Sequence, residues 1–347
     1  EGFIPISKKE KDLVLLEKPK IIYEPMFSYQ IEVFQKAKEK LSIPAEKRLI
    51  RVPTGGGKTK IAMEIVTDFF NDNENTTVLW LANTQELLEQ AAKEFIKNWS
   101  VRGRKSIHLN RAWGSTNSVR PDINGSKLII GGLQKLISFY RNNAKIKADL
   151  IIFDEAHHSA AKEYLQVINK SSKLTTRILG LTATPGRGEE AETQKLGEIF
   201  DNHRPIQLDT HDKYLTPIQY LQKIGVLSKL VFKTLDIPQI DSVFTNTEIN
   251  KLQKSADYDK PTLIKIGQIR IRNTRIIKHL LELNKEGKQV LYFGPSVEQS
   301  KLMALLLATF DVKVGVVDKD TPTEYRTELI DKFKEKKINF LLNYNVF

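Results

Sequence analysis

Three consecutive glycines followed by a lysine and a threonine stand in the segment Pro53-Thr54-Gly55-Gly56-Gly57-Lys58-Thr59. The segment lies between an apolar run at 49–52 and a helical pattern at 61–70. Glycines let backbone N–H groups close around phosphate oxygens, and the N-terminus of the following helix adds partial positive charge. We therefore expect Lys58 to meet the β- and γ-phosphates of a nucleotide and Thr59 to hold Mg²⁺. The usual first glycine of such a loop is replaced by Val52.

Two carboxylates stand about a hundred residues further on, in Asp154-Glu155-Ala156-His157, directly after the apolar run 150–153. The carboxyl end of a buried strand is where an α/β sheet places its ligand chemistry. Asp154 is predicted to hold Mg²⁺ through water, and Glu155 to polarise the attacking water as general base. His157 is the third catalytic candidate of this block. Alone the tetrapeptide is a weak signal, and it gains weight from the phosphate loop.

A third block, Thr182-Ala183-Thr184, follows another β-rich run at 178–181. Its hydroxyl groups are expected to bond the carboxylates and His157, so that the state of the nucleotide is coupled to the rest of the domain. An ordinary strand end before the turn at Pro185 would give the same residues.

These blocks need a sheet whose strand ends meet at one edge. Short apolar runs rich in β-branched residues alternate with longer helical patterns, which indicates βαβ units and a parallel sheet. The predicted strands of the first lobe are 49–52, 78–82, 128–130, 150–153 and 178–181. The fold class is therefore α/β, with a doubly wound parallel sheet.

The alternation stops near residue 209 and resumes later as a second α/β lobe. A long helical pattern covers 263–283, and strands are predicted at 290–293, 312–317 and 338–343. The expected organisation is an N-terminal arm at 1–24, a first lobe at 25–208, a connector at 209–260 and a second lobe at 261–347.

The three blocks, in this order and spacing, resemble the ATPase motifs of superfamily 2 helicases and translocases. The resemblance implies two RecA-like lobes, with ATP and Mg²⁺ as cofactors and a DEAH-type second motif at Asp154. It also implies that Gln30 reads the adenine. Many relatives carry an arginine three residues before that glutamine, where this chain has Phe27. The overall pattern looks most like bacterial type I and type III restriction motor subunits and related DNA repair or phage-defence helicases.

Segments that touch nucleic acid in this family have counterparts here. Thr84 and Gln85 lie at a predicted strand-to-helix turn, where a hydroxyl and backbone N–H groups can hold a phosphate. A second such turn contains Gly131 and Gly132. In the second lobe, the resemblance assigns the same role to Pro295 and Ser296.

Composition and net charge exclude some classes of function and fit others. The 347 residues carry a net charge of +12 and no cysteine, so thiolate catalysis and cysteine-ligated metal sites are excluded. The charge fits a nucleic acid bound on the folded surface, and a generally lysine-rich proteome fits it equally well. No apolar run approaches the roughly 18 residues of a membrane span, and the N-terminus lacks a signal-peptide core. We expect a cytoplasmic protein with no membrane partner.

The function expected from these features is an ATP-dependent DNA helicase or duplex DNA translocase, with possible nuclease or defence-complex subunits as partners. The alternative is an RNA-binding remodelling or sensor ATPase of the same superfamily. A phosphate-loop kinase is disfavoured by the second lobe and by the Thr182 block. The chain also looks truncated at Phe347, before the arginine-rich motif that completes the nucleotide site in relatives. An arginine finger contributes roughly 10³ to 10⁵ in rate in comparable systems. The chain itself is therefore expected to bind ATP and hydrolyse it poorly.

Overall fold

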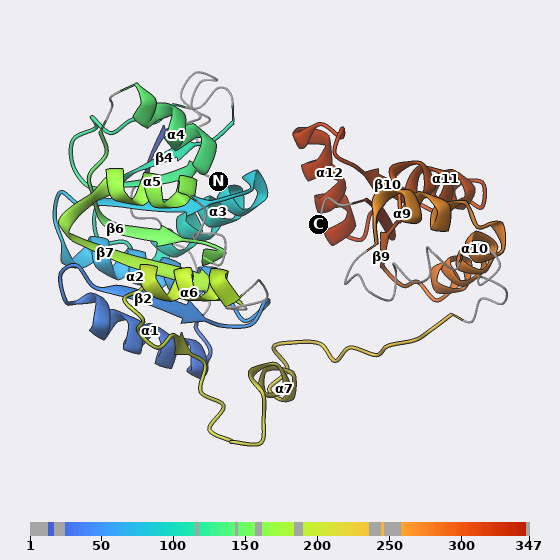
Figure 1. Ribbon diagram of the computed structural model, residues 1–347, viewed down its shortest axis with the longest axis horizontal. Coiled ribbons are helices and arrows are strands. Elements are labelled where there is room, and N and C mark those ends of the chain that lie inside the picture. Colours follow the sequence, from blue (N-terminus) through green and yellow to red (C-terminus); the bar gives the residue numbers. More distant parts are fainter. Residues whose placement is uncertain are drawn as a thin grey trace. The chain divides into compact units, whose positions relative to one another are not determined.

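The computed structural model describes residues 13–16, 25–114, 118–142, 145–156, 162–183, 190–235, 244–245 and 258–344. The chain divides into two compact units, Glu1–Lys229 (unit 1) and Leu230–Phe347 (unit 2) (Figure 1). Residues 209–229, the first part of the expected connector, group with unit 1. Among the described residues, no helix combines the length and apolar character that crossing a membrane requires.

Unit 1 is built on an eight-stranded sheet with the strand order β1-β4-β5-β3-β6-β7-β2-β8. Strand β1 pairs antiparallel with β4, and all the other neighbouring strands pair in parallel. The strands are β1 (Leu13–Leu16), β2 (Lys47–Arg51), β3 (Thr77–Ala82), β4 (Ile107–Ala112), β5 (Lys127–Gly132), β6 (Ala148–Phe153), β7 (Ser172–Thr182) and β8 (Ile206–Gln207).

Helices cover both faces of this sheet (Figure 1). One face carries α1 (Ser28–Leu41), α2 (Lys58–Asp72) and α3 (Gln85–Arg102), and the other α4 (Leu133–Arg141), α5 (Lys162–Ser171) and α6 (Glu190–Ile199). Every residue of β3 is buried. Strands buried on both faces need near-continuous apolar sequences, and this is why the five strands predicted for the first lobe are found. The predicted doubly wound α/β fold is confirmed.

The sheet order brings the predicted chemical blocks together. Strands β6, β7 and β2 are consecutive neighbours, and their parallel register pairs Phe153 with Gly180 and Arg51 with Thr182. Parallel strands end at the same edge of a sheet, so the phosphate loop, the two carboxylates and the Thr182 block all leave the sheet at that edge.

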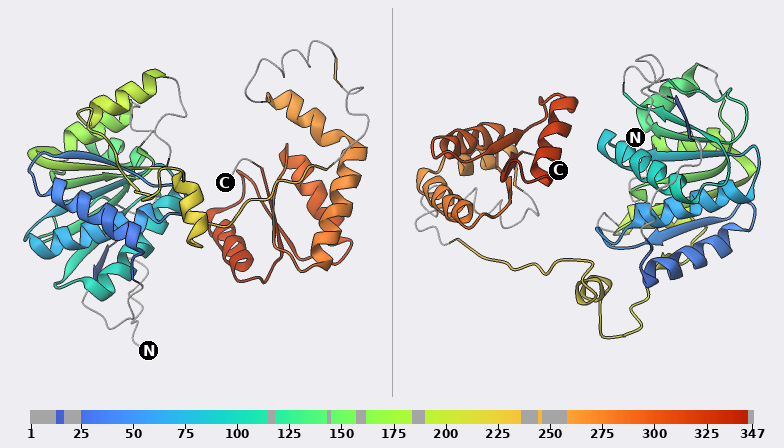
Figure 2. Two further views of the ribbon diagram at one scale, coloured as in Figure 1. Left: turned by 90° about the horizontal axis from the view of Figure 1, so that it is seen from below. Right: turned by 180° about the vertical axis from the view of Figure 1, so that it is seen from behind.

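Unit 2 contains a smaller parallel sheet with the strand order β10-β11-β9, formed by β9 (Val290–Phe293), β10 (Val314–Val317) and β11 (Phe340–Asn343). Its helices are α9 (Lys260–Gln268), α10 (Arg270–Lys285), α11 (Val297–Ala308) and α12 (Thr323–Lys334) (Figure 2). The long helix expected at 263–283 is wrong as a single element. It breaks at Ile269, which has an extended backbone, and Asn273 donates a hydrogen bond to the released carbonyl of Gly267 (2.8 Å).

Candidate functional site

The phosphate loop is a tight turn between β2 and α2. Gly56 N donates to Pro53 O at 2.9 Å, which closes the turn. Gly55 and Gly57 have φ angles of +80° and +79°, a region that side chains disfavour. Gly57 is the N-cap of α2, and no side chain caps this helix end. The first N–H groups of α2 are thus directed toward the loop, as an anion site at a helix N-terminus requires.

Helix α1 packs its first turn against the same loop. The Tyr29 hydroxyl donates to Gly56 O at 2.9 Å, and Gln30 Nε2 donates to the same carbonyl at 3.2 Å. Gln30 Oε1 accepts from Phe27 N, so both ends of the predicted adenine-reading amide have partners within the protein. Burial raises the pKa of Tyr29 to about 12. Tyr29 is a site residue that the sequence reasoning missed.

The two carboxylates follow β6 as predicted. Asp154 is buried, and its backbone N–H donates to Leu81 O at 2.9 Å, which extends the pairing of β6 with β3. Glu155 has a φ of +54°, in the left-handed region. Such a conformation is uncommon for a residue with a side chain and is found preferentially at functional sites. Asp154 Oδ1 accepts the Glu155 N–H at 3.1 Å.

The electrostatics at Asp154 fit a divalent cation. Burial, and after it the negative charge of Glu155, raise the pKa of Asp154, and Lys58 lowers it; the pKa that results is about 6. Lys58 is itself buried, at the first position of α2. A nearby cation favours the ionised form of a buried carboxylate whose pKa is raised. Mg²⁺ bound to nucleotide phosphates would be such a cation. Within the described part of the chain, no group of three or more histidine, cysteine, aspartate or glutamate side chains that could hold a metal ion occurs.

The Thr182 block lies beside the phosphate loop. Thr182 is fully buried at the end of β7, and its carbonyl accepts the Val52 N–H at 3.2 Å. The backbone that enters the phosphate loop is thereby joined to the backbone that enters the third block. Ala183 is the last described residue here, and the predicted residues His157 and Thr184 lie outside the described residues.

The predicted nucleic-acid turns line one groove in unit 1. A pocket of about 460 Å³ lies at the carboxyl ends of β3, β4 and β5, with Gln85, Gly132, Asn83, Trp113 and Lys135 among its lining residues. Thr84 caps α3 by accepting the Leu87 N–H, so its hydroxyl has a structural role. Gly131 contacts Leu136 closely, and its small size serves packing.

Tyr164 connects this groove to the carboxylates. It is buried on α5, and its hydroxyl donates to Asn83 Oδ1. Burial and the nearby charge of Asp154 both raise the pKa of Tyr164. Asn83 lines the groove, and the charge of Asp154 acts on Tyr164, so this hydrogen-bonded pair connects the two predicted sites. Their chain separation of 81 residues leaves no local signal that could have found the pair.

The predicted contacts of unit 2 lie at the turn after β9. Ser296 caps α11 by accepting the Gln299 N–H at 3.1 Å, and Pro295 precedes it in the same turn. Gln299 Nε2 donates to the Tyr292 hydroxyl at 2.8 Å and to Asn273 Oδ1 at 3.3 Å. A polar network therefore fixes this turn from inside unit 2.

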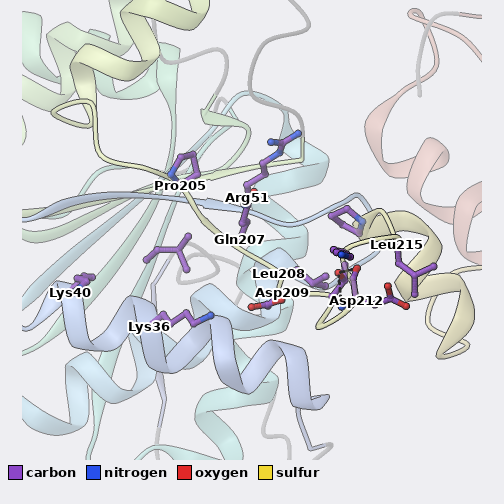
Figure 3. A pocket seen from close by; sticks show the side chains of 13 residues that line it. Lys36, Lys40, Arg51, Pro205, Gln207, Leu208, Asp209, Asp212 and Leu215 are labelled. Carbon is purple, nitrogen blue, oxygen red and sulfur yellow. Dashed lines mark hydrogen bonds between the residues drawn. The ribbon is translucent and has the colours of Figure 1, made fainter.

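A further pocket, of about 670 Å³, lies between α1 and the chain that follows β8 (Figure 3). Lys36, Lys40 and Arg51 line it together with Asp209 and Asp212. Both aspartates accept backbone N–H groups two residues ahead, from His211 and Tyr214 at 2.9 Å. None of the residues predicted for ATP or nucleic acid lines this pocket.

Comparison with protein families gives two matches. Residues 24–187 match the family described as "Type III restriction enzyme, res subunit", and residues 272–347 match "Helicase conserved C-terminal domain". The first match contains the phosphate loop and both carboxylates, and the second contains the turn at Ser296. Together the two matches support the resemblance of this chain to the superfamily 2 helicases.

Individual relatives agree with this grouping. The chain is 25% identical to IRC3 of Saccharomyces cerevisiae, whose name places it provisionally among the ATP-dependent helicases, over 86% of this chain and 41% of the relative. It is 28% identical to the ATP-dependent DNA helicase MPH1 of Pyricularia oryzae, over 46% of this chain and 15% of the relative. The chain thus spans less than half the length of either protein.

Solved structures show the fold. A Dbp5 variant of S. cerevisiae bound to a Gle1 variant and IP6 matches 93% of this chain and 74% of that chain, with a TM-score of 0.55 and 15% identity. S. cerevisiae Dbp5 bound to RNA and ADP–BeF3 matches with a TM-score of 0.52 and 14% identity, over 93% and 75%. The structural neighbours are RecA-like helicase domains.

Proposed function

We propose that this chain is the motor core of an ATP-dependent DNA helicase or duplex DNA translocase in a restriction, phage-defence or repair system. The supporting observation is a juxtaposition at one sheet edge. The glycine loop, the buried Asp154 with Glu155, and Thr182 occupy the ends of three adjacent strands. A groove lined by Gln85 and Gly132 lies at other strand ends of the same sheet.

Each residue has a defined task in this proposal. The glycine loop and the N-terminus of α2 bind phosphate oxygens, while Lys58 neutralises the terminal phosphates. Thr59, and Asp154 through water, would hold Mg²⁺, which would stabilise the negative charge of the phosphates. Glu155 orients a water molecule for attack on the terminal phosphate and accepts its proton. Lys58 and Glu155 both act on Asp154 electrostatically, Lys58 lowering its pKa and Glu155 raising it.

The names of relatives support DNA as the partner, since several are named as DNA helicases, including MPH1. The net charge of +12 suits the phosphate backbone of either nucleic acid. Movement along that backbone would follow from coupling between the nucleotide site and the groove, for which Thr182 and the Tyr164–Asn83 hydrogen bond are the available connections.

Two substitutions test the nucleotide site. Lys58→Ala should weaken binding of a fluorescent ATP analogue at least ~30-fold, since loss of a charge-paired group costs about 2 kcal/mol or more. Glu155→Gln should bind normally and lower phosphate release about 10²- to 10⁴-fold, the usual range for a general base. Single-turnover conditions with excess protein make slow hydrolysis measurable. Lys93→Ala, an exposed change on α3, is the control. Equal loss of affinity in both test variants would contradict the role of Glu155.

The partner is tested by stimulation of phosphate release with single-stranded DNA, duplex DNA and RNA. Stimulation by DNA supports the proposal. Stimulation by RNA alone would replace it with an RNA-dependent remodelling or sensor ATPase. Transfer of phosphate to a small molecule in a 1:1 ratio would indicate a kinase.

A further inference from the structure

A short helix packs on the phosphate loop. Helix α7 (Pro217–Lys223) and the turn after it contribute Leu221, which is fully buried, and the half-buried Leu227. A Cβ added to Gly56 would lie 3.2 Å from Leu221 Cδ1, and one added to Gly55 would lie 2.7 Å from Leu227 Cδ2. The two leucines therefore rest directly on Gly55 and Gly56, the last two residues of the turn that begins at Pro53.

The segment that carries these leucines is itself well defined. Thr216 and Gln219 form a capping box at the start of α7. After the helix, Gly225 has a φ of +78°, and the N–H groups of Val226 and Leu227 both donate to Leu221 O, at 2.9 and 3.1 Å. These two hydrogen bonds to one carbonyl oxygen fold the chain back, so that Leu221 and Leu227 both face the phosphate loop.

The first turn of α1 completes the contact. Tyr29, Leu208 and Leu221 form a buried cluster, against which Tyr220 and Leu227 pack. The rings of Tyr29 and Tyr220 meet edge to face, with centroids 6.4 Å apart. The Tyr29 hydroxyl also donates to Gly56 O. The cluster therefore contacts the loop both through this carbonyl and through the glycines on which the two leucines pack.

The same segment leads out of unit 1. Unit 1 ends at Lys229, two residues after Leu227, and Leu230 is 75% exposed. Glycine loses more conformational freedom on ordering than any other residue. Packing of the leucines on the loop therefore restricts its glycines, and any shift of Gly55 toward Leu227 would require Leu227 to move.

We propose that Leu221 and Leu227 are positioning residues for the phosphate loop, and that residues 220–229 transmit the loop's occupancy to the chain that enters unit 2. The inference rests on the proposed function, because it assumes that the loop binds nucleotide phosphates. It adds a second route out of the nucleotide site, separate from the Thr182 block.

The first test measures binding to the 347-residue chain. Leu227→Ala should weaken binding of the ATP analogue about three- to tenfold, because the unbound loop is no longer ordered. The same loss of affinity should appear for inorganic tripolyphosphate, measured by competition, since Leu227 is expected to act on the loop that binds the phosphates. Leu227→Met should restore binding to within about twofold of the parent, because it conserves volume. Leu230→Ala is the matched control, and unchanged tryptophan fluorescence on heating shows that the fold is kept.

The second test follows the response of residues 220–229 to ATP directly. The chain has no cysteine, so Ser228→Cys can be labelled at a single site with an environment-sensitive fluorophore. ATP should change the label's emission with the same midpoint as binding, and Lys58→Ala should abolish the change. In Leu227→Ala the change should be lost even when ATP saturates the loop.

The results of these tests distinguish failure of this inference from failure of the proposed function. Equal affinities of Leu227→Ala and Leu230→Ala for ATP, or a label that stays silent while ATP is bound, would overturn the inference and leave the proposed function intact. Absence of Lys58-dependent ATP binding in the parent chain would overturn both.

Discussion

Units 1 and 2 have related sheets with different surroundings. In unit 1 helices cover both faces of the sheet, and every residue of β3 is buried. In unit 2 the central strand β11 is buried, whereas Leu291 and Phe293 of the edge strand β9 are 43% and 57% exposed. The residues expected to act on ATP belong to the unit with the deeper core. A carboxylate there, such as Asp154, is far from bulk water and responds strongly to nearby charge.

Charged pairs follow the same division. In unit 1 the carboxylate of Glu64 is buried and paired with Arg102, which also bonds Asp68 at 2.9 Å. In unit 2 the pair between Lys332 and Glu328 lies on the surface of α12. The difference predicts that loss of a buried contact costs more stability than loss of an exposed one, and three experiments test this in order of expected size.

Phe200→Ala should have the largest effect. Phe200 is buried against β7, and removal of such a ring costs about 3–5 kcal/mol. All three tryptophans, at positions 80, 99 and 113, belong to unit 1, so denaturation followed by tryptophan fluorescence reports that unit. Phe340→Ala, a matched core substitution in unit 2, should leave the tryptophan transition in place. A comparable shift in both variants would mean that the units unfold as one, against the division described above.

Arg102→Ala should have an intermediate effect. It removes a cation from the buried Glu64, and loss of one partner of a buried pair costs about 3–5 kcal/mol when no water reaches it. Arg102 is partly exposed, so we expect about 2 kcal/mol or more, measured by the same tryptophan transition. Lys332→Ala breaks the exposed pair on α12 and should cost about 0.5 kcal/mol or less, measured by hydrogen exchange in unit 2. The contrast fails if the two losses are similar.

The smallest effect is expected at the surface of unit 1. Glu32 lies 3.0 Å from His211 and raises its pKa, with Asp209 acting in the same direction and Lys36 opposing. A raised pKa means that the pair stabilises the fold below the ordinary histidine pKa and that this stabilisation is lost as pH rises through the folded value. Glu32→Gln should therefore lower the melting temperature slightly at about pH 5.5 and have no effect at about pH 9. A larger loss at the higher pH would contradict this sign.

Much of unit 1 is predictable because its local patterns and its tertiary burial agree. The strand before Asp154 and the last residues of the strand before Thr182 have the near-continuous apolar runs that double-sided burial demands. Strand β4 was missed because its sequence includes His108, Asn110 and Arg111. Asn110 is fully buried, and the backbone of Ser118 and Arg120 satisfies its amide at 3.0 and 2.9 Å. The sequence shows a polar residue there and gives no sign of those partners.

The sequence by itself determined which residues are candidates for binding phosphate and a cation, because glycine spacing, a lysine at a helix start and carboxylates at a strand end are local properties. Only the tertiary structure decided that Leu221 and Leu227 pack on the phosphate loop and that Tyr164 bonds Asn83. These contacts join residues far apart in the chain. They depend on the order of strands in the sheet and on how side chains fill the space between elements, which no local spacing encodes.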